Sequence, residues 1–262
     1  MSVPLLLAID VGNTNTVFAV YEDDRQKSQW RAVTTVERTA DEYAVWLAQL
    51  MTLAGIAPER IADAIISSVV PESDFMLHSL CRRYYGCEPL MVSADLDLGI
   101  AVEVEQPAEV GADRLVNAVA AHSRHPGPLI VIDFGTATTF DVVAADGAYR
   151  GGVIAPGVNL SLDALHMASA RLPRVAARRP PKVVGTSTTK AMQSGVYWGY
   201  VSLIEGVVAR IEAEFGAAMT VLATGGLAPL FDRATEVIRH VEPDLTMHGL
   251  LEIYRRNRKD RT

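Results

Sequence analysis

Two segments of the chain repeat one order of elements: an apolar strand, a short polar turn and a second apolar strand. They cover residues 5–20 and 129–143. Aligned on Asp10 and Asp133, both read apolar-apolar-Asp-x-Gly-[Asn/Thr]-x-x-Thr, and the two aspartates stand close to half of the 262 residues apart. A repeat of this length predicts two similar halves built on one plan.

The residue types of the repeated turn are those that bind phosphate and cations. A glycine lets the backbone approach a phosphate closely, Asn and Thr supply neutral donors, and an aspartate at a strand end can hold a cation directly or through water. A single copy would be read as a hairpin with a polar turn, for which Asn and Gly are common. Two copies favour a ligand-binding role.

Helices alternate with strands through the rest of the chain. The pattern predicts a capping box at residues 39–42 before a helix over 43–54, a strand within 61–70 stopped by Pro71, helices over 112–122 and 187–215, and a short buried strand over 220–223. This order indicates a mixed α/β architecture with ligands at the strand ends between the halves. We divide the chain into an N-terminal half, residues 1–117, and a C-terminal half, residues 118–262.

Composition excludes several classes of protein. Lys and Arg number 24 against 31 Asp and Glu, for a net charge of −7, which argues against a nucleic-acid partner. No apolar run approaches the roughly 18 residues of a membrane helix. Two cysteines, Cys81 and Cys87, are too few for a disulfide framework, so we expect a cytoplasmic protein without a membrane partner. The basic residues from Arg255 to Arg261 are expected to form a solvated tail.

Five blocks of the chain resemble a known family. Asp-x-Gly turns in both halves, with Gly225-Gly226 late in the chain, are similar to the actin, sugar kinase and Hsp70 superfamily. The match narrows to the type III pantothenate kinases on blocks that follow the family's order. These blocks are Asp10-Val11-Gly12-Asn13-Thr14-Asn15, Glu109-Val110-Gly111-Ala112-Asp113-Arg114, Asp133-Phe134-Gly135-Thr136-Ala137-Thr138-Thr139, Gly151-Gly152-Val153-Ile154-Ala155-Pro156-Gly157 and Ala191-Met192-Gln193-Ser194-Gly195.

The resemblance implies a fold, a reaction and cofactors. The fold would be a duplicated actin-like, or ribonuclease H-like, α/β fold with a nucleotide cleft between the halves. The reaction would be ATP-dependent phosphorylation of pantothenate to 4′-phosphopantothenate, the first step towards coenzyme A. The resemblance further implies a homodimer that uses magnesium and a monovalent cation, potassium or ammonium. The chain lacks a Gly-x-x-x-x-Gly-Lys-[Ser/Thr] loop, which argues against a P-loop kinase.

The resemblance also assigns roles to the two turns. The first turn would hold the ATP phosphates, and Thr136 would add a contact from the second. Asp10 would act on hydrated magnesium, Asp133 would bind the monovalent cation, and Gly225-Gly226 would approach the adenosine. The residues of the first turn are Asp10, Val11, Gly12, Asn13, Thr14, Asn15, Thr16 and Val17.

Asp113 is the candidate general base for the substrate hydroxyl, and Arg114 with the backbone of Gly111 and Ala112 would hold the substrate. An Asp in the first turn of a helix is also favourable for local reasons, because it caps the helix and suits its dipole. An Arg there opposes the dipole, so substrate binding explains Arg114 better: arginine binds carboxylates through paired hydrogen bonds, and pantothenate has a carboxylate. Thr188 has two alternative roles. It would either contact the substrate, in one version from the other subunit of the dimer, or cap the N-terminus of its own helix.

One position departs from the family. About seven residues before Gly111 many relatives carry a tyrosine at the substrate pocket, and here the residue is Val104. The change removes a hydroxyl and an aromatic face, which bears on substrate affinity more than on the reaction. Three other functions remain: a kinase of this superfamily for another small hydroxylated substrate, an inactive kinase-like regulatory protein, and an actin-like filament or chaperone ATPase. The last is disfavoured by the short chain.

Overall fold

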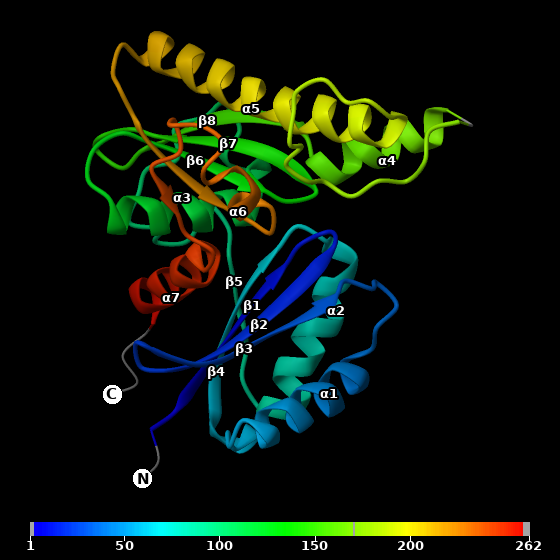
Figure 1. Cartoon of the computed structure of the whole chain (residues 1–262). Helices are drawn as coiled ribbons and strands as arrows, with labels where there is room; N and C mark the ends of the chain where they lie inside the picture. The colour runs from blue at the N-terminus through cyan, green and yellow to red at the C-terminus, as the bar shows by residue number, and fades with distance from the viewer. Residues whose placement is uncertain (1–2, 170, 259–262) are drawn as a thin grey trace. The chain divides into compact units, whose positions relative to one another are not determined.

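The fold consists of two five-stranded mixed sheets with helices packed on them (Figure 1). It is given by a computed structural model that describes residues 3–169 and 171–258. The first sheet and its helices contain β1 (Leu5–Val11), β2 (Asn15–Glu22), β3 (Arg25–Val33), α1 (Ala40–Leu53), β4 (Ile61–Ser68), α2 (Pro71–Leu80) and β5 (Leu90–Met91). The following elements are α3 (Ala112–Arg124), β6 (Leu129–Phe134), β7 (Ala137–Val143), β8 (Tyr149–Pro156), α4 (Val158–Ala168), α5 (Thr188–Phe215), β9 (Thr220–Thr224), α6 (Ala228–Phe231), β10 (His240–Val241) and α7 (Leu245–Asn257).

The two sheets share one topology. The first has the strand order β3-β2-β1-β4-β5 and the second, read from its other edge, β8-β7-β6-β9-β10. In each sheet the first three strands in sequence pair antiparallel, and the next two add in parallel. The α/β class and the duplication expected from the sequence are therefore confirmed.

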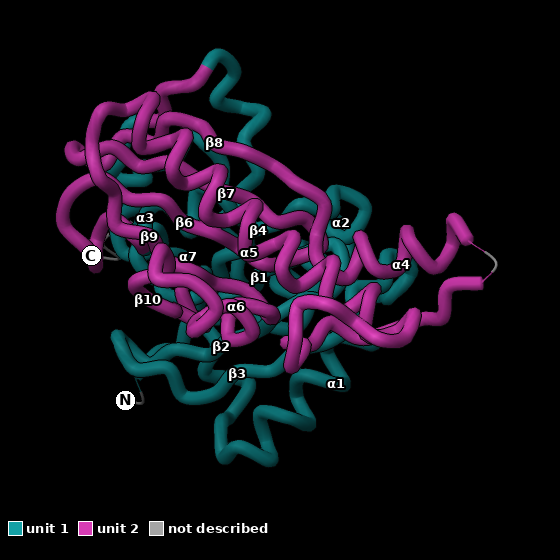
Figure 2. The backbone as a smooth tube through the Cα atoms, turned by 45° about the horizontal axis from the view of Figure 1, so that its top comes forward, with its two compact units in different colours: residues 1–101, 105–120, 246–262 teal, residues 102–104, 121–245 magenta. Residues whose placement is uncertain are grey.

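The chain divides into two compact units whose limits differ from the division at 117/118 (Figure 2). Unit 1 comprises residues 1–101, 105–120 and 246–262, and unit 2 comprises residues 102–104 and 121–245. The C-terminal residues thus belong with the first sheet, whereas the sequence division groups them with the second half.

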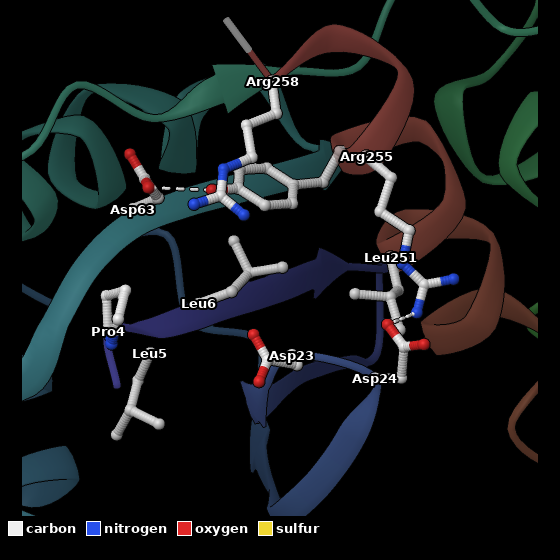
Figure 3. Close-up of a pocket in the computed structure, with 10 residues that line it drawn as sticks. Pro4, Leu5, Leu6, Asp23, Asp24, Asp63, Leu251, Arg255 and Arg258 are labelled. Atoms are coloured by element: carbon white, nitrogen blue, oxygen red, sulfur yellow. Dashed lines mark hydrogen bonds and ion pairs between the residues drawn. The ribbon is translucent and has the colours of Figure 1, made fainter. Parts of the chain in front are cut away.

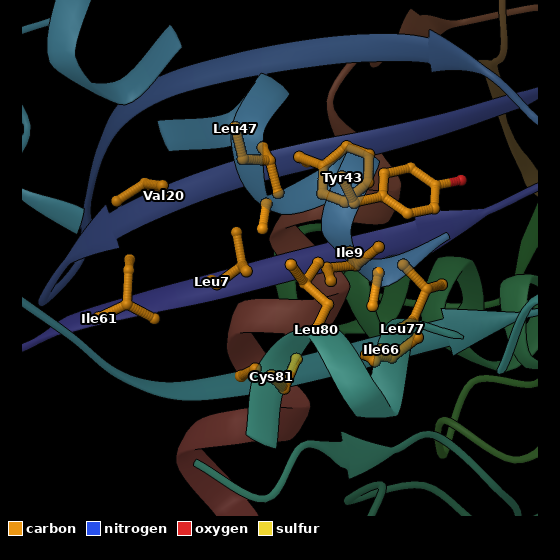
Figure 4. Close-up of a cluster of buried hydrophobic side chains, with 14 of the residues drawn as sticks. Leu7, Ile9, Val20, Tyr43, Leu47, Ile61, Ile66, Leu77, Leu80 and Cys81 are labelled. Carbon is orange, nitrogen blue, oxygen red and sulfur yellow. The ribbon is translucent and has the colours of Figure 1, made fainter. Parts of the chain in front are cut away.

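The core of unit 1 lies between the first sheet and the helices α1 and α2 (Figure 4). β1 is apolar from Leu5 to Ile9, and Leu7 and Ile9 point from it into this core, fully buried against Leu47 of α1 and Leu77 of α2. The capping box predicted for α1 is confirmed: the Thr39 hydroxyl accepts from the backbone N–H of Glu42, whose carboxylate accepts from the backbone N–H of Thr39 at 2.8 Å.

The opposite face of the first sheet carries α7. The Tyr254 hydroxyl donates to the Asp63 carboxylate of β4 at 2.8 Å, and Thr246 donates to Asn117 of α3 at 2.8 Å. Arg255 pairs with Asp24 in the turn between β2 and β3. Arg255 and Arg256 are exposed, as expected of a solvated segment, but they belong to the helix α7 of unit 1 and not to a tail; Lys259 and Arg261 lie outside the described residues.

Unit 2 has its own core, in which α4, α5 and α6 pack on the second sheet. Its centre is a stack of aromatic rings: Phe231 of α6 lies between Phe134 of β6, at 4.9 Å between centroids, and Tyr197 of α5, at 5.6 Å. Within residues 3–169 and 171–258, no helix has the length and apolar character to cross a bilayer.

Candidate active site

The first repeated turn joins β1 to β2 and is closed by its own backbone. The Gly12 N–H donates to the Asn15 carbonyl at 3.0 Å. Thr34, the residue after β3, supports the turn from beside it. Its hydroxyl donates to the Gly12 carbonyl at 2.7 Å and lies 2.9 Å from the Thr16 hydroxyl, and its N–H donates to the Thr14 carbonyl at 3.0 Å.

The residues of this turn divide by exposure. Asn13 and Thr14 are exposed and Asp10, Gly12, Asn15 and Val17 are partly exposed, whereas the side chains of Val11 and Thr16 are buried. Exposed neutral donors at the tip, on a backbone fixed by Thr34, form a surface suited to phosphate. The side chains of Val11 and Thr16 are covered by the protein and cannot reach a ligand. They contribute to the shape of the turn instead.

The second repeated turn, between β6 and β7, has the same closure but is one residue shorter. The Gly135 N–H donates to the Ala137 carbonyl at 3.0 Å, and Gly135 and Thr136 are exposed at the tip. Thr16 pairs with Val11 across the first hairpin, and Thr138 pairs with Phe134 across the second. The buried Thr138 is thus the structural counterpart of Thr16, although the sequence repeat matches Thr16 with Thr139.

Two glycines lie against the second turn. Gly157, which precedes α4, lies so close that a Cβ on it would overlap the Thr136 carbonyl and lie 2.8 Å from the Gly135 carbonyl oxygen. Gly225, which follows β9 with a φ of +88°, lies against the Asp133 carboxylate, and a Cβ there would lie 2.7 Å from the Phe134 nitrogen. Both positions need glycine because the turn occupies the space of a side chain.

Asp113 lies in the first turn of α3 in unit 1. Its Oδ1 accepts from the backbone N–H of Arg114 at 2.8 Å, so the local role in the helix terminus is real. The carboxylate also lies over Gly111, where a Cβ would be 2.6 Å from Oδ1. Burial raises the pKa of the Asp113 carboxyl above that of an ordinary aspartate, and this effect outweighs the lowering of the pKa by the hydrogen bond and the charge of Arg114.

The start of α3 and the first turn lie at the same end of the first sheet. Gly111 packs near Val69: a Cβ atom built on Gly111 would lie 3.6 Å from Cγ1 of Val69. The Val69 N–H in turn donates to the Val11 carbonyl at 3.0 Å. Asp10 and Asp113 therefore both lie at the end of the first sheet where β1 and β4 have their carboxyl ends. Ligands of open α/β sheets usually bind at this end.

Thr188 is the first residue of α5 and is exposed. The helix is capped by Ser187, whose hydroxyl accepts from the Lys190 N–H at 3.3 Å. The residue that caps α5 is therefore Ser187 and not Thr188.

Val104, in the position of the family's tyrosine, belongs to a short segment of unit 2 beside β8. Val102 forms a bridge with Tyr149, and the Glu103 N–H donates to the Tyr149 carbonyl at 2.9 Å. The Val104 side chain lies 3.6 Å from the Cβ position of Gly151.

A cavity of about 120 Å³ lies in unit 1 away from these residues (Figure 3). It is lined by the start of β1, the turn between β2 and β3, and α7, so it is at the opposite end of β1 from Asp10. Within the described ranges no group of three or more His, Cys, Asp or Glu side chains is arranged to hold a metal ion. A cation at Asp10 or Asp133 therefore needs further ligands, such as water or phosphate.

Sequence reasoning missed the residues that support the two turns: Thr34 was not singled out, and Gly157 stood in a family block without a role. Thr34 and Gly157 each follow the third strand of their sheet, and each contacts the hairpin turn beside it. Thr34 acts through its hydroxyl, and Gly157 through its backbone. The two residues therefore occupy equivalent places in the two sheets although their residue types differ.

Comparison with known proteins gives consistent matches. The family model described as type III pantothenate kinase matches residues 6–210. The chain is 64% identical over 254 residues to the type III pantothenate kinase of Paramagnetospirillum magneticum, covering 97% of this chain and 98% of the relative. It is 63% identical over 257 residues to that of Rhodospirillum rubrum, covering 98% and 100%.

Solved structures share the fold at low sequence identity. The ethanolamine utilization protein EutJ of Carboxydothermus hydrogenoformans is similar with a TM-score of 0.57 at 15% identity, covering 96% of this chain and 90% of that one. An inorganic polyphosphate/ATP-glucomannokinase of an Arthrobacter species is similar with a TM-score of 0.50 at 14% identity, covering 95% and 98%. These likenesses agree with a duplicated actin-like fold. On the extent of the family match and the identity to its members, the chain belongs to the type III pantothenate kinase family.

Proposed function

We propose that this chain transfers the γ-phosphoryl group of ATP to the hydroxyl of pantothenate, forming 4′-phosphopantothenate and ADP. The observation that carries the proposal within the structure is the partly buried Asp113, held at the same edge of the first sheet as the exposed tip of the first turn. Family membership supplies the identity of the acceptor.

The two turns bind the nucleotide. Asn13, Thr14 and Asn15 offer neutral donors to the phosphates, Gly12 closes the turn with its own N–H, and Thr136 adds a donor from the second turn. Phosphoryl transfer requires positioning and charge neutralisation more than covalent help from the protein, and a turn with fixed backbone supplies the former.

Asp113 acts as the general base. The hydroxyl oxygen of pantothenate attacks the γ-phosphorus, the bond from that phosphorus to the β–γ bridging oxygen breaks, and the hydroxyl proton passes to Asp113. Oδ1 is engaged by the Arg114 N–H, so we assign Oδ2 to this proton. A raised pKa suits the role, because a base is most effective when its pKa lies near the working pH.

The substrate is held by the start of α3 and by α5. Arg114 pairs with the pantothenate carboxylate, and the backbone of Gly111 and Ala112 lines the same site. The Thr188 hydroxyl, which is exposed and not the cap of α5, contacts the substrate.

The residues present fit both cations. Asp10 is partly exposed beside the phosphate-binding tip, so it can hold magnesium through water while the phosphates supply the remaining oxygen ligands. Asp133 lies against the Gly225 backbone and offers a carboxylate to potassium or ammonium. The cations neutralise the phosphate charge that this net-acidic chain does not balance by itself.

We further propose a homodimer formed through unit 2. Large apolar side chains are exposed on β8, on α4 and before α5, including Ile154 at 63%, Met167 at 74% and Val184 at 79% of their surface. Contact with a second copy would remove these apolar side chains from water.

We place the enzyme in the cytoplasm, in keeping with Cys81 and Cys87, both buried thiols.

The test is product formation. Purified protein with ATP, magnesium and pantothenate should yield 4′-phosphopantothenate by mass spectrometry, with more product when potassium is present. A folded protein that binds ATP but yields no product under either condition contradicts the proposal. A panel of other small hydroxylated acceptors then separates a different kinase from an inactive regulatory protein.

A further inference from the structure

Tyr200 of α5 makes two hydrogen bonds next to the second turn. Its hydroxyl donates to the Pro156 carbonyl at 2.6 Å and lies 2.7 Å from the Ser161 hydroxyl. The tyrosine hydroxyl has a single hydrogen, and it donates this hydrogen to the Pro156 carbonyl. In the second bond the Ser161 hydroxyl is therefore the donor and the Tyr200 oxygen the acceptor. The tyrosine is buried, and this makes the two bonds costly to lose.

These bonds fix both sides of Gly157. Pro156 precedes Gly157 at the end of β8, and Ser161, in the first turn of α4, donates its N–H to the Gly157 carbonyl at 2.9 Å. Gly157 in turn lies against the carbonyls of Gly135 and Thr136. A path of direct contacts therefore runs from Tyr200 through Gly157 to the tip of the second turn.

A second support reaches the same turn from α6. The Phe231 ring stacks on Phe134, which immediately precedes Gly135, with 12° between the ring planes. Tyr197 stacks on the other side of Phe231, and Tyr200 lies 6.3 Å from it. Both tyrosines of α5 thus contact this aromatic stack, but they differ in their hydroxyl groups. In the described part of the chain the buried Tyr197 hydroxyl has no hydrogen-bond partner.

We propose that Tyr200, with Ser161, is a positioning residue for nucleotide binding: its hydroxyl sets the place of Gly157 and thereby of Thr136. The inference rests on the proposed function to the extent that Thr136 contacts an ATP phosphate. It assigns to α5 a role in phosphate binding through a residue that does not touch the nucleotide.

The matched pair Tyr200→Phe and Tyr197→Phe tests this. Each change removes one hydroxyl from one helix and keeps the ring on Phe231. We expect Tyr200→Phe to raise the dissociation constant of a magnesium complex of a non-hydrolysable ATP analogue, measured by calorimetry, about three- to tenfold. The KM for ATP should rise with it, and the KM for pantothenate should stay within about twofold. Tyr197→Phe should bind the analogue like the unchanged protein.

Ser161→Ala is the second variant, because it removes one of the two bonds and keeps the ring. We expect it to weaken nucleotide binding in the same direction and by less. Wild-type affinity in Tyr200→Phe, or equal weakening in Tyr197→Phe, overturns the proposal. So does a wild-type protein that does not bind the analogue, since the second turn would then hold no phosphate. A protein that binds the analogue but does not phosphorylate pantothenate contradicts the proposed reaction alone.

Discussion

A Cβ atom on Gly111 would lie 2.6 Å from Oδ1 of Asp113. The carboxylate lies over the backbone of a residue that has no side chain, and there is no room there for a methyl group. The glycine of the Gly-Ala-Asp-Arg block is thus explained by the place of the aspartate.

Gly111→Ala should displace the Asp113 carboxylate and lower kcat by about 10²-fold, because an error of roughly 1 Å in a reacting group costs about that much. The melting temperature should change little, since the side chain that must give way is short and at the edge of the unit. Gly199→Ala in α5 is the control: a Cβ there meets nothing within 4 Å, and the change should leave kcat unaltered.

Asp113→Asn should lower kcat by about 10²–10⁴-fold if the carboxylate takes the hydroxyl proton. Steady-state kinetics with saturating ATP and pantothenate measure this. Arg114→Gln should instead raise the KM for pantothenate, because it removes a carboxylate ligand. Near-normal turnover in Asp113→Asn would assign the aspartate to the helix terminus alone.

The raised pKa of Asp113 gives two dependences on pH of opposite sign. The base acts only when deprotonated, so kcat should fall as the pH drops through this raised pKa. Stability should behave the other way: the folded state keeps its proton to a higher pH than the unfolded state, so the free energy of unfolding contributed by this group decreases as the pH rises from the unfolded pKa through the folded one. Above that window Asp113→Asn should be at least as stable as the unchanged protein in denaturant titrations, which separates loss of the base from misfolding.

Thr34→Val should weaken ATP binding, because the first turn loses the hydroxyl that donates to Gly12. The loss of stability should be about 1 kcal/mol, the usual value for one hydrogen bond. Thr34→Ser keeps the hydroxyl and is the control, and it should retain most of the affinity. Equal KM values for ATP in the two variants would show that the turn keeps its shape without Thr34.

Asp133→Asn should abolish the increase of activity with potassium, because the amide lacks the charge that holds the cation. Rates are measured over a potassium titration at constant ionic strength. Asp232→Asn, which changes an aspartate of unit 2 paired only loosely with Arg233 at 4.0 Å, should keep the potassium response. A potassium response that survives in Asp133→Asn would place the cation elsewhere.

Local signals in the sequence predicted most of the elements. The Thr39–Glu42 capping box, the stop at Pro71 and the two strand–turn–strand repeats depend on neighbours in the chain, and each is found in the structure. The residues assigned to substrate and nucleotide were recognised as family blocks, and their assigned roles remain predictions.

What the sequence missed depends on contacts between distant residues. The alignment on the aspartates matched Thr16 with Thr139, but hairpin pairing depends on turn length, and the shorter second turn shifts the match to Thr138. Thr34 and Tyr200 support the turns from another strand and a helix, and nothing in their local sequence marks this. Gly157 belongs to a family block, but its contact with the second turn is visible only in the structure. The place of α7 in unit 1 likewise follows from bonds such as that of Tyr254 with Asp63, which are far apart in the chain.

The return of α7 to the first sheet affects the order in which the molecule can be assembled. Apart from residues 102–104, the segments of unit 2 form one continuous stretch, 121–245, whereas unit 1 is drawn from both sides of it. A chain emerging from the ribosome can therefore finish its second unit while its first still lacks a helix. Asp63 of the first sheet gains its bond from Tyr254 only after translation has passed that residue, so the part of the enzyme that begins first is completed last.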